Sequence, residues 1–173
     1  EDKIIKDKDE ELYLPISAIY GPNGGGKSNV LEALKSLVLK VLRPLYATND
    51  NKEFIMNMKK SVIEPFAFSK NTINEPTEFK LFFRTSQAEY RYQLFIKKDI
   101  IQYERLDRIK FETGRRSALF ERNEDIISLK GMFSKLKTSD ELSDTLPLIS
   151  YLGITYSKNE VVRDVINWFD DEI

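Results

Sequence analysis

Hydrophobic residues near the start of the chain change from a continuous run to helical spacing. The run Ile16–Tyr20 follows Pro15 and predicts a buried strand. Beyond a glycine-rich interval, apolar residues recur three and four positions apart, which predicts an amphipathic helix. We expect this helix to end at Arg43-Pro44, because the residue before a proline is disfavoured in the α conformation. Its apolar stripe comprises Val30, Leu31, Leu34, Leu37, Val38, Val41 and Leu42.

Hydrophobic residues in the middle of the chain, 65–130, recur with a period of two. Short alternating segments separated by polar connections predict an antiparallel meander. Aromatic and basic residues in the order Tyr90-Arg91-Tyr92 can indicate stacking on nucleic-acid bases. The regular alternation favours instead an interpretation in which Tyr90 and Tyr92 face the core. The predicted strands are Glu78–Thr85, Glu89–Ile96, Ile100–Phe111, Ala118–Arg122 and Asp125–Leu129.

Helical patterns return in the last third, residues 138–173. Thr138-x-x-Glu141 has the form of a capping box, and Gly153 suits the position after a short helix over Leu146–Leu152. Ser157-x-x-Glu160 predicts the start of another helix. The stripe of this last helix is Val161, Val162, Val165, Ile166 and Phe169. Between the first helix and the meander, the pattern predicts a loop over Tyr46–Lys52 and a short helix over Glu53–Ile63.

Composition narrows the classes of function. The chain has 173 residues, 41% of them hydrophobic and 32% charged, as in a soluble globular domain. A net charge of −1 gives no global attraction for nucleic acid or anionic lipid, although a local basic patch remains compatible with it. Absence of cysteine excludes disulfides and fits a cytoplasmic protein. Absence of histidine removes the commonest general base, and no apolar run reaches membrane-spanning length.

The segment Gly21–Ser28 (GPNGGGKS) carries the most specific chemistry, because it matches G-x-x-x-x-G-K-[ST] at every fixed position. Three consecutive glycines allow backbone N–H groups to approach a phosphate chain without side-chain clashes. Lys27 can reach the β- and γ-phosphates, and Ser28 offers a hydroxyl ligand to Mg²⁺. The predicted strand before the loop and helix after it place the loop at a helix N-terminus, which favours anions. We therefore predict a nucleotide site within residues 12–44.

Other parts of a hydrolytic site are not evident. Val165–Glu172 is the one candidate for an apolar strand that ends in acids, but Asn167 interrupts it and its spacing is helical. We interpret it as the polar end of a helix. Guanine-reading motifs are also absent from the sequence. Three functions remain open: an ATP-driven switch, a small-molecule phosphotransferase, and a nucleotide sensor that does not hydrolyse.

The segment Ile19–Leu34 (IYGPNGGGKSNVLEAL) resembles the Walker A segment of ABC-type, SMC-like ATPases. More narrowly, it is similar to AAA-labelled bacterial ATPases allied to OLD-family nucleases, many of them found in abortive-infection and phage-defence systems. The similarity covers most of residues 16–170. Further stretches resemble that group in the same order: Asn74–Phe79, Tyr90-Arg91-Tyr92, Leu119–Arg122 and Val165–Phe169.

This resemblance implies an α/β fold of the P-loop NTPase class. It would be an ABC-type head (lobe I) with an antiparallel β-subdomain and C-terminal helices. Such heads form head-to-head homodimers around ATP and act on an effector protein or DNA, with no membrane partner. The implied nucleotide-binding residues are Pro22, Asn23, Gly24, Gly25, Gly26, Lys27, Ser28 and Asn29, with Asn29 near the α-phosphate. Lys27 is the implied catalytic residue, and Ser28 the implied Mg²⁺ ligand.

The chain also departs from that group. The signature motif, the Walker B acids and the switch histidine are missing, and Gln87, Gln93 and Gln102, the candidates for the Q-loop, all fall in the meander. We therefore expect residues 1–173 to be the N-terminal portion of the ATPase domain. Alone, this portion should bind nucleotide weakly and hydrolyse little.

Overall fold

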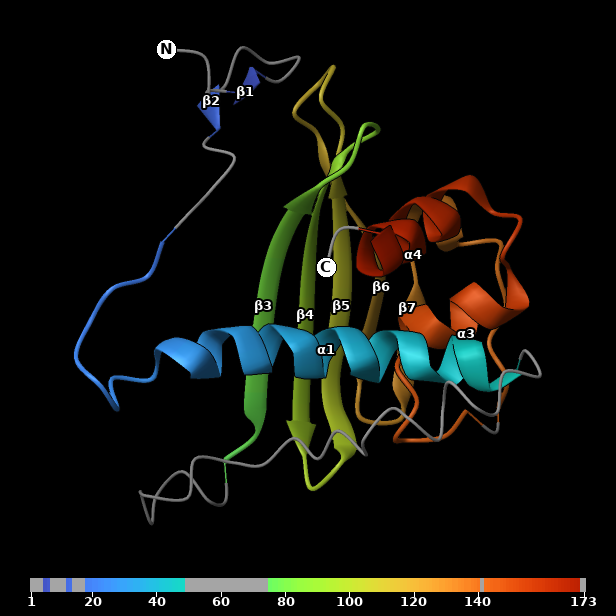
Figure 1. Cartoon of the computed structure of the whole chain (residues 1–173). Helices are drawn as coiled ribbons and strands as arrows, with labels where there is room; N and C mark the ends of the chain where they lie inside the picture. The colour runs from blue at the N-terminus through green and yellow to red at the C-terminus, as the bar shows by residue number, and fades with distance from the viewer. Residues whose placement is uncertain (1–4, 7–11, 14–17, 49–74, 141, 172–173) are drawn as a thin grey trace. The chain divides into compact units, whose positions relative to one another are not determined.

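A computed structural model describes residues 5–6, 12–13, 18–48, 75–140 and 142–171 (Figure 1). The chain divides into two compact units, Glu1–Leu34 and Lys35–Ile173. The first unit contains the antiparallel pair of strands β1 (Ile5–Lys6) and β2 (Leu12–Tyr13) and the glycine-rich loop. It also contains the first residues of helix α1 (Lys27–Thr48), which continues into the second unit.

The predicted strand Ile16–Tyr20 is wrong for its described part. Ala18–Tyr20 forms no strand, while Ile16 and Ser17 lie outside the described residues. Ile19 is 56% exposed and Tyr20 is 90% exposed. An apolar run becomes a strand only where a neighbour completes its hydrogen bonds, and no described residue pairs with this one.

Helix α1 extends through Pro44 to Thr48, so the predicted end at Arg43-Pro44 is also wrong. A proline inside a helix costs about 3 kcal/mol, because it removes one hydrogen bond and crowds the preceding turn. Contacts made beyond the proline help to offset this cost, since the Tyr46 hydroxyl donates to the carboxylate of Asp170 and its side chain packs against the core. The apolar stripe is confirmed from Leu37 onward, where Leu37, Val38, Val41 and Leu42 are buried, whereas Val30 and Leu31 are exposed.

The predicted meander is confirmed as a five-stranded antiparallel sheet. Its strands follow in the order β3-β4-β5-β6-β7, with each strand next to its neighbour in sequence. Alternation places Tyr90, Tyr92 and Leu94 on the core face, where all three are fully buried, so the core interpretation of Tyr90-Arg91-Tyr92 is confirmed. The strands are β3 (Thr77–Arg84), β4 (Glu89–Lys97), β5 (Ile100–Ile109), β6 (Arg116–Asn123) and β7 (Ile126–Leu129).

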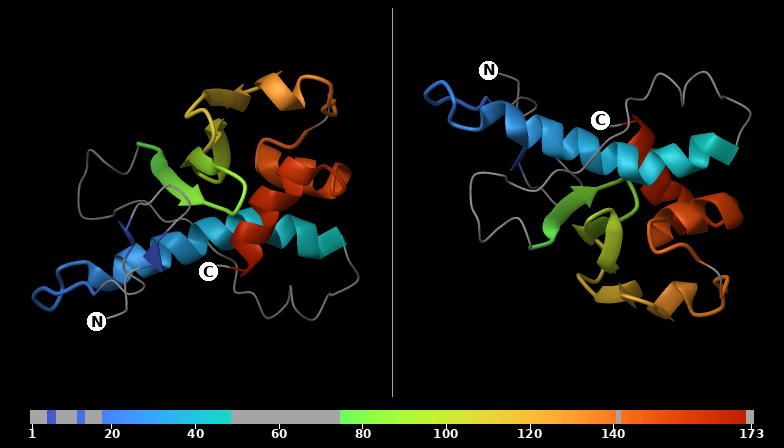
Figure 2. Two further views of the ribbon diagram at one scale, coloured as in Figure 1. Left: turned by 90° about the horizontal axis from the view of Figure 1, so that it is seen from above. Right: turned by 90° about the horizontal axis from the view of Figure 1, so that it is seen from below.

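Helices cover one face of this sheet. After the short 3-10 helix η1 (Gly131–Phe133) come α3 (Leu148–Thr155) and α4 (Glu160–Asp171). Within the second unit, the rest of α1 packs with them on the same side (Figure 2). The aromatic ring of Phe83 stacks on Trp168 at 4.2 Å, and Phe169 approaches Phe83 and Tyr92 edge-on at 5.8 Å. The core of this unit therefore lies between the sheet and the helices.

Details of the helical segment differ from the prediction. No described helix begins at Thr138, and Glu141 lies outside the described residues. Gly153 lies inside α3 rather than after it, where a Cβ would come within 2.8 Å of Leu45 Cδ2, so close helix packing accounts for it. Asn159, not Ser157, caps α4, because its Oδ1 accepts from the Val161 and Val162 N–H groups at 3.1 and 3.2 Å.

Two earlier interpretations are supported in this region. The stripe of α4 is buried at Val161, Val162, Val165 and Phe169, as its spacing predicts. Residues 165–171 belong to this helix, which confirms that they do not form a metal-binding strand.

The predicted helix over 53–63 lies outside the described residues, and Tyr46–Thr48 are helical rather than a loop. No described helix is long and apolar enough to span a bilayer.

Candidate nucleotide-binding site

Glycines set the shape of the loop Gly21–Ser28. Gly24 and Gly26 have φ angles of +79° and +80°, in the left-handed region that side chains rarely occupy. The N–H of Gly25 donates to the carbonyl of Pro22 at 3.1 Å, which closes a tight turn. A Cβ on Gly25 would lie 3.0 Å from that same oxygen, so the backbone of the turn would have to shift to accept one. The local sequence therefore forms a compact turn with alternating left-handed residues, a conformation found in backbone anion-binding nests.

The loop leads directly into a helix N-terminus. Lys27 and Ser28 are the first two residues of α1, and the N–H of Asn29 donates to the Gly26 carbonyl at 3.0 Å. First-turn N–H groups of a helix lack intrahelical acceptors and carry the positive end of the dipole. Ser28 and Asn29 are exposed. This arrangement favours a phosphate above the loop.

The ammonium group of Lys27 lies folded over the loop. Its Nζ donates to the carbonyl of Gly21 at 2.8 Å and to the carbonyl of Pro22 at 2.7 Å. Both acceptors belong to the first two residues of the motif, so the positive charge lies against the backbone of the loop. A lysine stem is flexible enough to exchange these neutral acceptors for phosphate oxygens, which bind an ammonium more strongly.

All eight predicted site residues occupy this one stretch, because they are contiguous in sequence. Pro22, Asn23, Gly24 and Gly25 are exposed, while Gly26 and Lys27 are partly covered. The residue roles stay predictions. In the described parts of the chain, no group of three or more His, Cys, Asp or Glu side chains could hold a metal. The serine hydroxyl fits Mg²⁺, which prefers oxygen donors and completes its shell with phosphate oxygens and water.

The period of two that predicts which strand residues face the core also predicts which face outward. These outward residues were not among the predicted site residues. Phe82, Phe95 and Tyr103 lie on the sheet face opposite the helices, among basic side chains. Their signal was the period of two itself, since a strand that buries Tyr92 and Leu94 must turn Phe95 outward.

A glycine-rich turn that leads into a helix beginning with Lys27-Ser28 defines a P-loop nucleotide-binding protein. The chain belongs to the family described as "AAA domain, putative AbiEii toxin, Type IV TA system", whose model matches residues 16–168. This match includes the loop, the sheet and most of α4, and it bears out the resemblance to AAA-family ATPases linked to abortive infection. It also makes the chain α/β and of the nucleotide-binding, ATPase type. Neither a curated protein nor a solved structure gave a match.

Proposed function

We propose that the chain binds Mg-ATP through Pro22–Asn29 and supplies half of an ABC-type ATPase site. The geometry of the loop carries the proposal. Two left-handed glycines shape a tight turn that leads into a helix N-terminus, and the ammonium of Lys27 lies against the backbone carbonyls of this turn. On nucleotide binding, Lys27 would leave the carbonyls of Gly21 and Pro22 for the β- and γ-phosphates. Ser28 would hold the Mg²⁺ that neutralises the phosphate charge.

A second head completes the site in this proposal. Within the first unit, Glu32 is the one carboxylate among the described residues, and it is exposed on α1. Phosphoryl transfer depends on positioning the attacking water and stabilising the equatorial oxygens, which a loop alone does not achieve. We infer that ATP joins two heads as a homodimer and that hydrolysis separates them. The family description names a putative toxin of a type IV TA system. We propose that this cycle controls an effector protein, or DNA, in the phage-defence setting that the sequence resemblance implies.

One alternative is a sensor that binds ATP without hydrolysing it. The two functions differ in turnover at high protein concentration. A head dimer releases phosphate at a rate per chain that rises with concentration, whereas a sensor releases none. A phosphotransferase would release product only with an added acceptor.

The first experiment measures binding of a fluorescent ATP analogue with Mg²⁺ to the full chain. Lys27→Ala is expected to weaken binding by about tenfold or more, because charge-assisted hydrogen bonds to phosphate are lost. Lys35→Ala is the matched control, since it removes an exposed lysine from the same helix two turns further on. Equal affinity for both variants would overturn the assignment of the loop.

The second experiment tests the metal and the dimer. Ser28→Ala should lose most of the dependence of affinity on Mg²⁺ while keeping metal-free binding, because only the hydroxyl is removed. Phosphate release by the full-length protein is then measured over a range of protein concentrations. Turnover per chain that does not depend on concentration would contradict the two-head site and leave nucleotide binding intact.

A further inference from the structure

The sheet of the second unit has one face without a helical cover among the described elements. α1 beyond Lys35, α3 and α4 all lie on the opposite face (Figure 2). On the open face Phe82, a large aromatic residue of β3, is 62% exposed. Open antiparallel sheets with outward aromatic rings are the form in which RNA-recognition modules present stacking platforms.

Aromatic and cationic side chains alternate across this face. The guanidinium of Arg91 lies 5.2 Å from the centre of the Phe82 ring, and the ammonium of Lys80 lies 5.2 Å from that of Phe95. Tyr103, the partner of Phe95 on β5, places its ring 5.1 Å from the Phe95 ring. Three rings on three neighbouring strands therefore lie among positive charges, on a surface that we call the open-face patch: Lys80, Phe82, Arg91, Phe95 and Tyr103.

The charge of the patch is positive although the chain as a whole is at −1. Ion pairs around this face join six cationic side chains to four carboxylates. The cations are Lys80, Arg84, Arg91, Arg105, Arg116 and Lys130, and the acids are Glu78, Glu89, Asp107 and Glu121.

The pairing is uneven across the face. Asp107 is buried between Arg105 and Arg116, whereas Glu89 lies 3.6 Å from Arg91 Nε, which has no hydrogen-bond partner among the described residues. That nitrogen is buried, but the Arg91 side chain as a whole is 36% exposed, so the remainder of this charged side chain is open to an external anion.

We propose that the open-face patch binds single-stranded nucleic acid, with bases stacked on Phe82, Phe95 and Tyr103 and phosphates held by Lys80 and Arg91. Rings without base-edge readout accept any base, so binding should be tolerant of sequence. A duplex keeps its bases stacked internally and can use only the charges, so it should bind more weakly than a single strand. This site is distinct from the nucleotide loop and does not depend on it.

The test is a fluorescence-anisotropy titration of the full chain against labelled oligothymidylate of about 20 nucleotides, a length that spans a typical single-strand site. Phe82→Ala is expected to weaken binding by about fivefold or more, since one stacked base is lost. Phe82→Leu should lower the affinity by the same factor, because leucine keeps an apolar side chain but has no flat ring on which a base can stack. Lys80→Gln should lower the slope of log affinity against log salt by about one phosphate contact.

Two substitutions on the helical side are matched controls. Ile154→Ala and Lys158→Gln remove an exposed apolar residue and an exposed cation from the other face and should leave affinity unchanged. Oligonucleotide binding should persist in saturating Mg-ATP, and Phe82→Ala should bind Mg-ATP as the wild type does.

Several results would overturn the proposal while leaving the nucleotide site intact. These are equal affinity for duplex and single strand, full affinity in Phe82→Leu, or no oligonucleotide binding by a chain that binds Mg-ATP. The last result would favour a protein partner on this face. Displacement of the oligonucleotide by Mg-ATP would place it at the loop instead.

Discussion

The carboxylate of Glu104, on strand β5, accepts a hydrogen bond from the backbone N–H of Leu148, the first residue of α3, at 2.6 Å. Its Oε1 also accepts from the N–H of Ile149 at 3.1 Å and from the hydroxyl of Tyr92 at 3.0 Å. Pro147, at the N-cap of α3, makes no side-chain cap bond. A side chain from the sheet therefore supplies the cap that the local sequence lacks, which is required because these N–H groups are buried away from water.

Replacing Glu104 by Ala should destabilise the second unit by about 3 kcal/mol, because two N–H groups and one hydroxyl lose their buried acceptor. Glu104→Gln keeps one acceptor oxygen and should cost about half as much. Urea unfolding followed by circular dichroism measures both free energies. If Ala were no more harmful than Gln, the capping role would be wrong.

The pH dependence of stability should report the same carboxylate. Burial raises the pKa of Glu104 above its usual range, despite the opposing effect of its hydrogen bonds with Leu148 and Ile149. The folded chain then binds this proton more tightly than the unfolded chain. The stabilisation that this proton contributes to the folded state is fully present below the ordinary carboxyl pKa and is lost as pH rises through the pKa of Glu104 in the folded chain. The free-energy advantage of the wild type over Glu104→Gln should therefore shrink as pH rises, and an advantage that grows would contradict this.

Burial of Glu104 and Arg122 shows which parts of the fold could be predicted. Both positions lie on the inward side of their strands, with Leu106 and Phe120, so the period of two is sufficient to place them there. Their chemistry is set by distant partners. The Arg122 guanidinium donates to the carbonyls of Glu124, Leu146 and Ser143, two of which are more than 20 residues away. Alternation is a local pattern and can be predicted from the sequence. Contacts between residues far apart in the chain cannot be predicted in this way.

In the first unit too, locally determined structure could be predicted, whereas structure that depends on distant neighbours could not. The shape of the glycine-rich loop could be predicted because glycines and a helix start within eight residues determine it. The strand before it could not, since a strand depends on its neighbour. Pro44 gave a strong local signal that contacts of Tyr46 override. The capping-box spacing from Ser157 to Glu160 predicted a cap two residues before the observed one at Asn159, whose residue type also suits an N-cap.

Gly26→Val should weaken Mg-ATP binding by about tenfold through backbone geometry alone. A Cβ on Gly26 would meet nothing closer than Asn29 Nδ2 at 4.0 Å, so space is not the constraint. The constraint is the φ angle of +80°, because a β-branched residue in this conformation costs more than about 1 kcal/mol and would shift the backbone N–H groups of the loop. Gly114→Val is the matched control, with φ at +59° in the connection between β5 and β6 of the second unit. If both variants bound Mg-ATP normally, the loop would not be the phosphate cradle.

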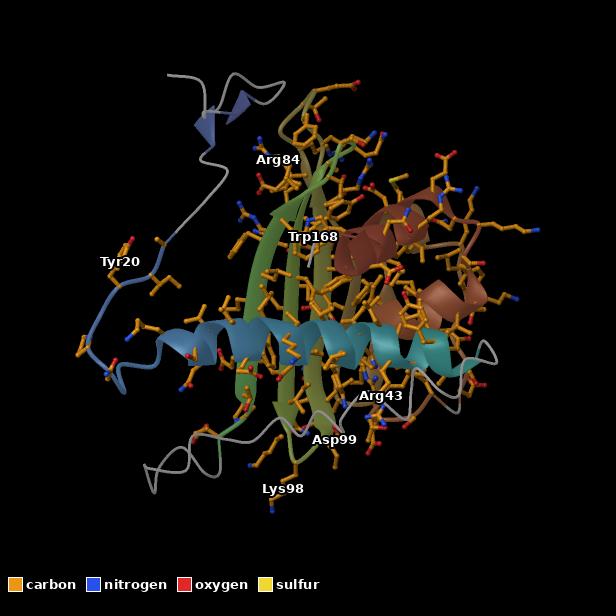
Figure 3. The ribbon with its side chains drawn as sticks, in the orientation of Figure 1. Tyr20, Arg43, Arg84, Lys98, Asp99 and Trp168 are labelled. Atoms are coloured by element: carbon orange, nitrogen blue, oxygen red, sulfur yellow. The ribbon has the colours of Figure 1, made fainter. Side chains whose placement is uncertain are left out.

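The turn between β4 and β5 has strain that can be removed. Lys97 pairs with Ile100, which leaves a two-residue hairpin loop of Lys98 and Asp99. Their φ angles are +49° and +69°, and Lys98 points away from the sheet at the hairpin tip (Figure 3). Two residues in the left-handed region form the turn type that Asn-Gly fits best, and other L-residues pay about 1 kcal/mol each. Asp99 has a compensating contact, since Lys40 Nζ lies 2.5 Å from its Oδ1.

Lys98→Asn is therefore expected to stabilise the second unit by about 0.5 to 1 kcal/mol, because it relieves strain and breaks no described contact. Asp99→Gly relieves the same strain but removes the partner of Lys40, whose side chain is only 13% exposed, so the net change should be close to zero. Combining Asp99→Gly with Lys40→Met separates the two effects, because the ammonium no longer needs a partner. Urea midpoints of the single and double variants form a thermodynamic cycle. A gain in Asp99→Gly as large as that in Lys98→Asn would show that the Lys40–Asp99 pair contributes nothing to stability.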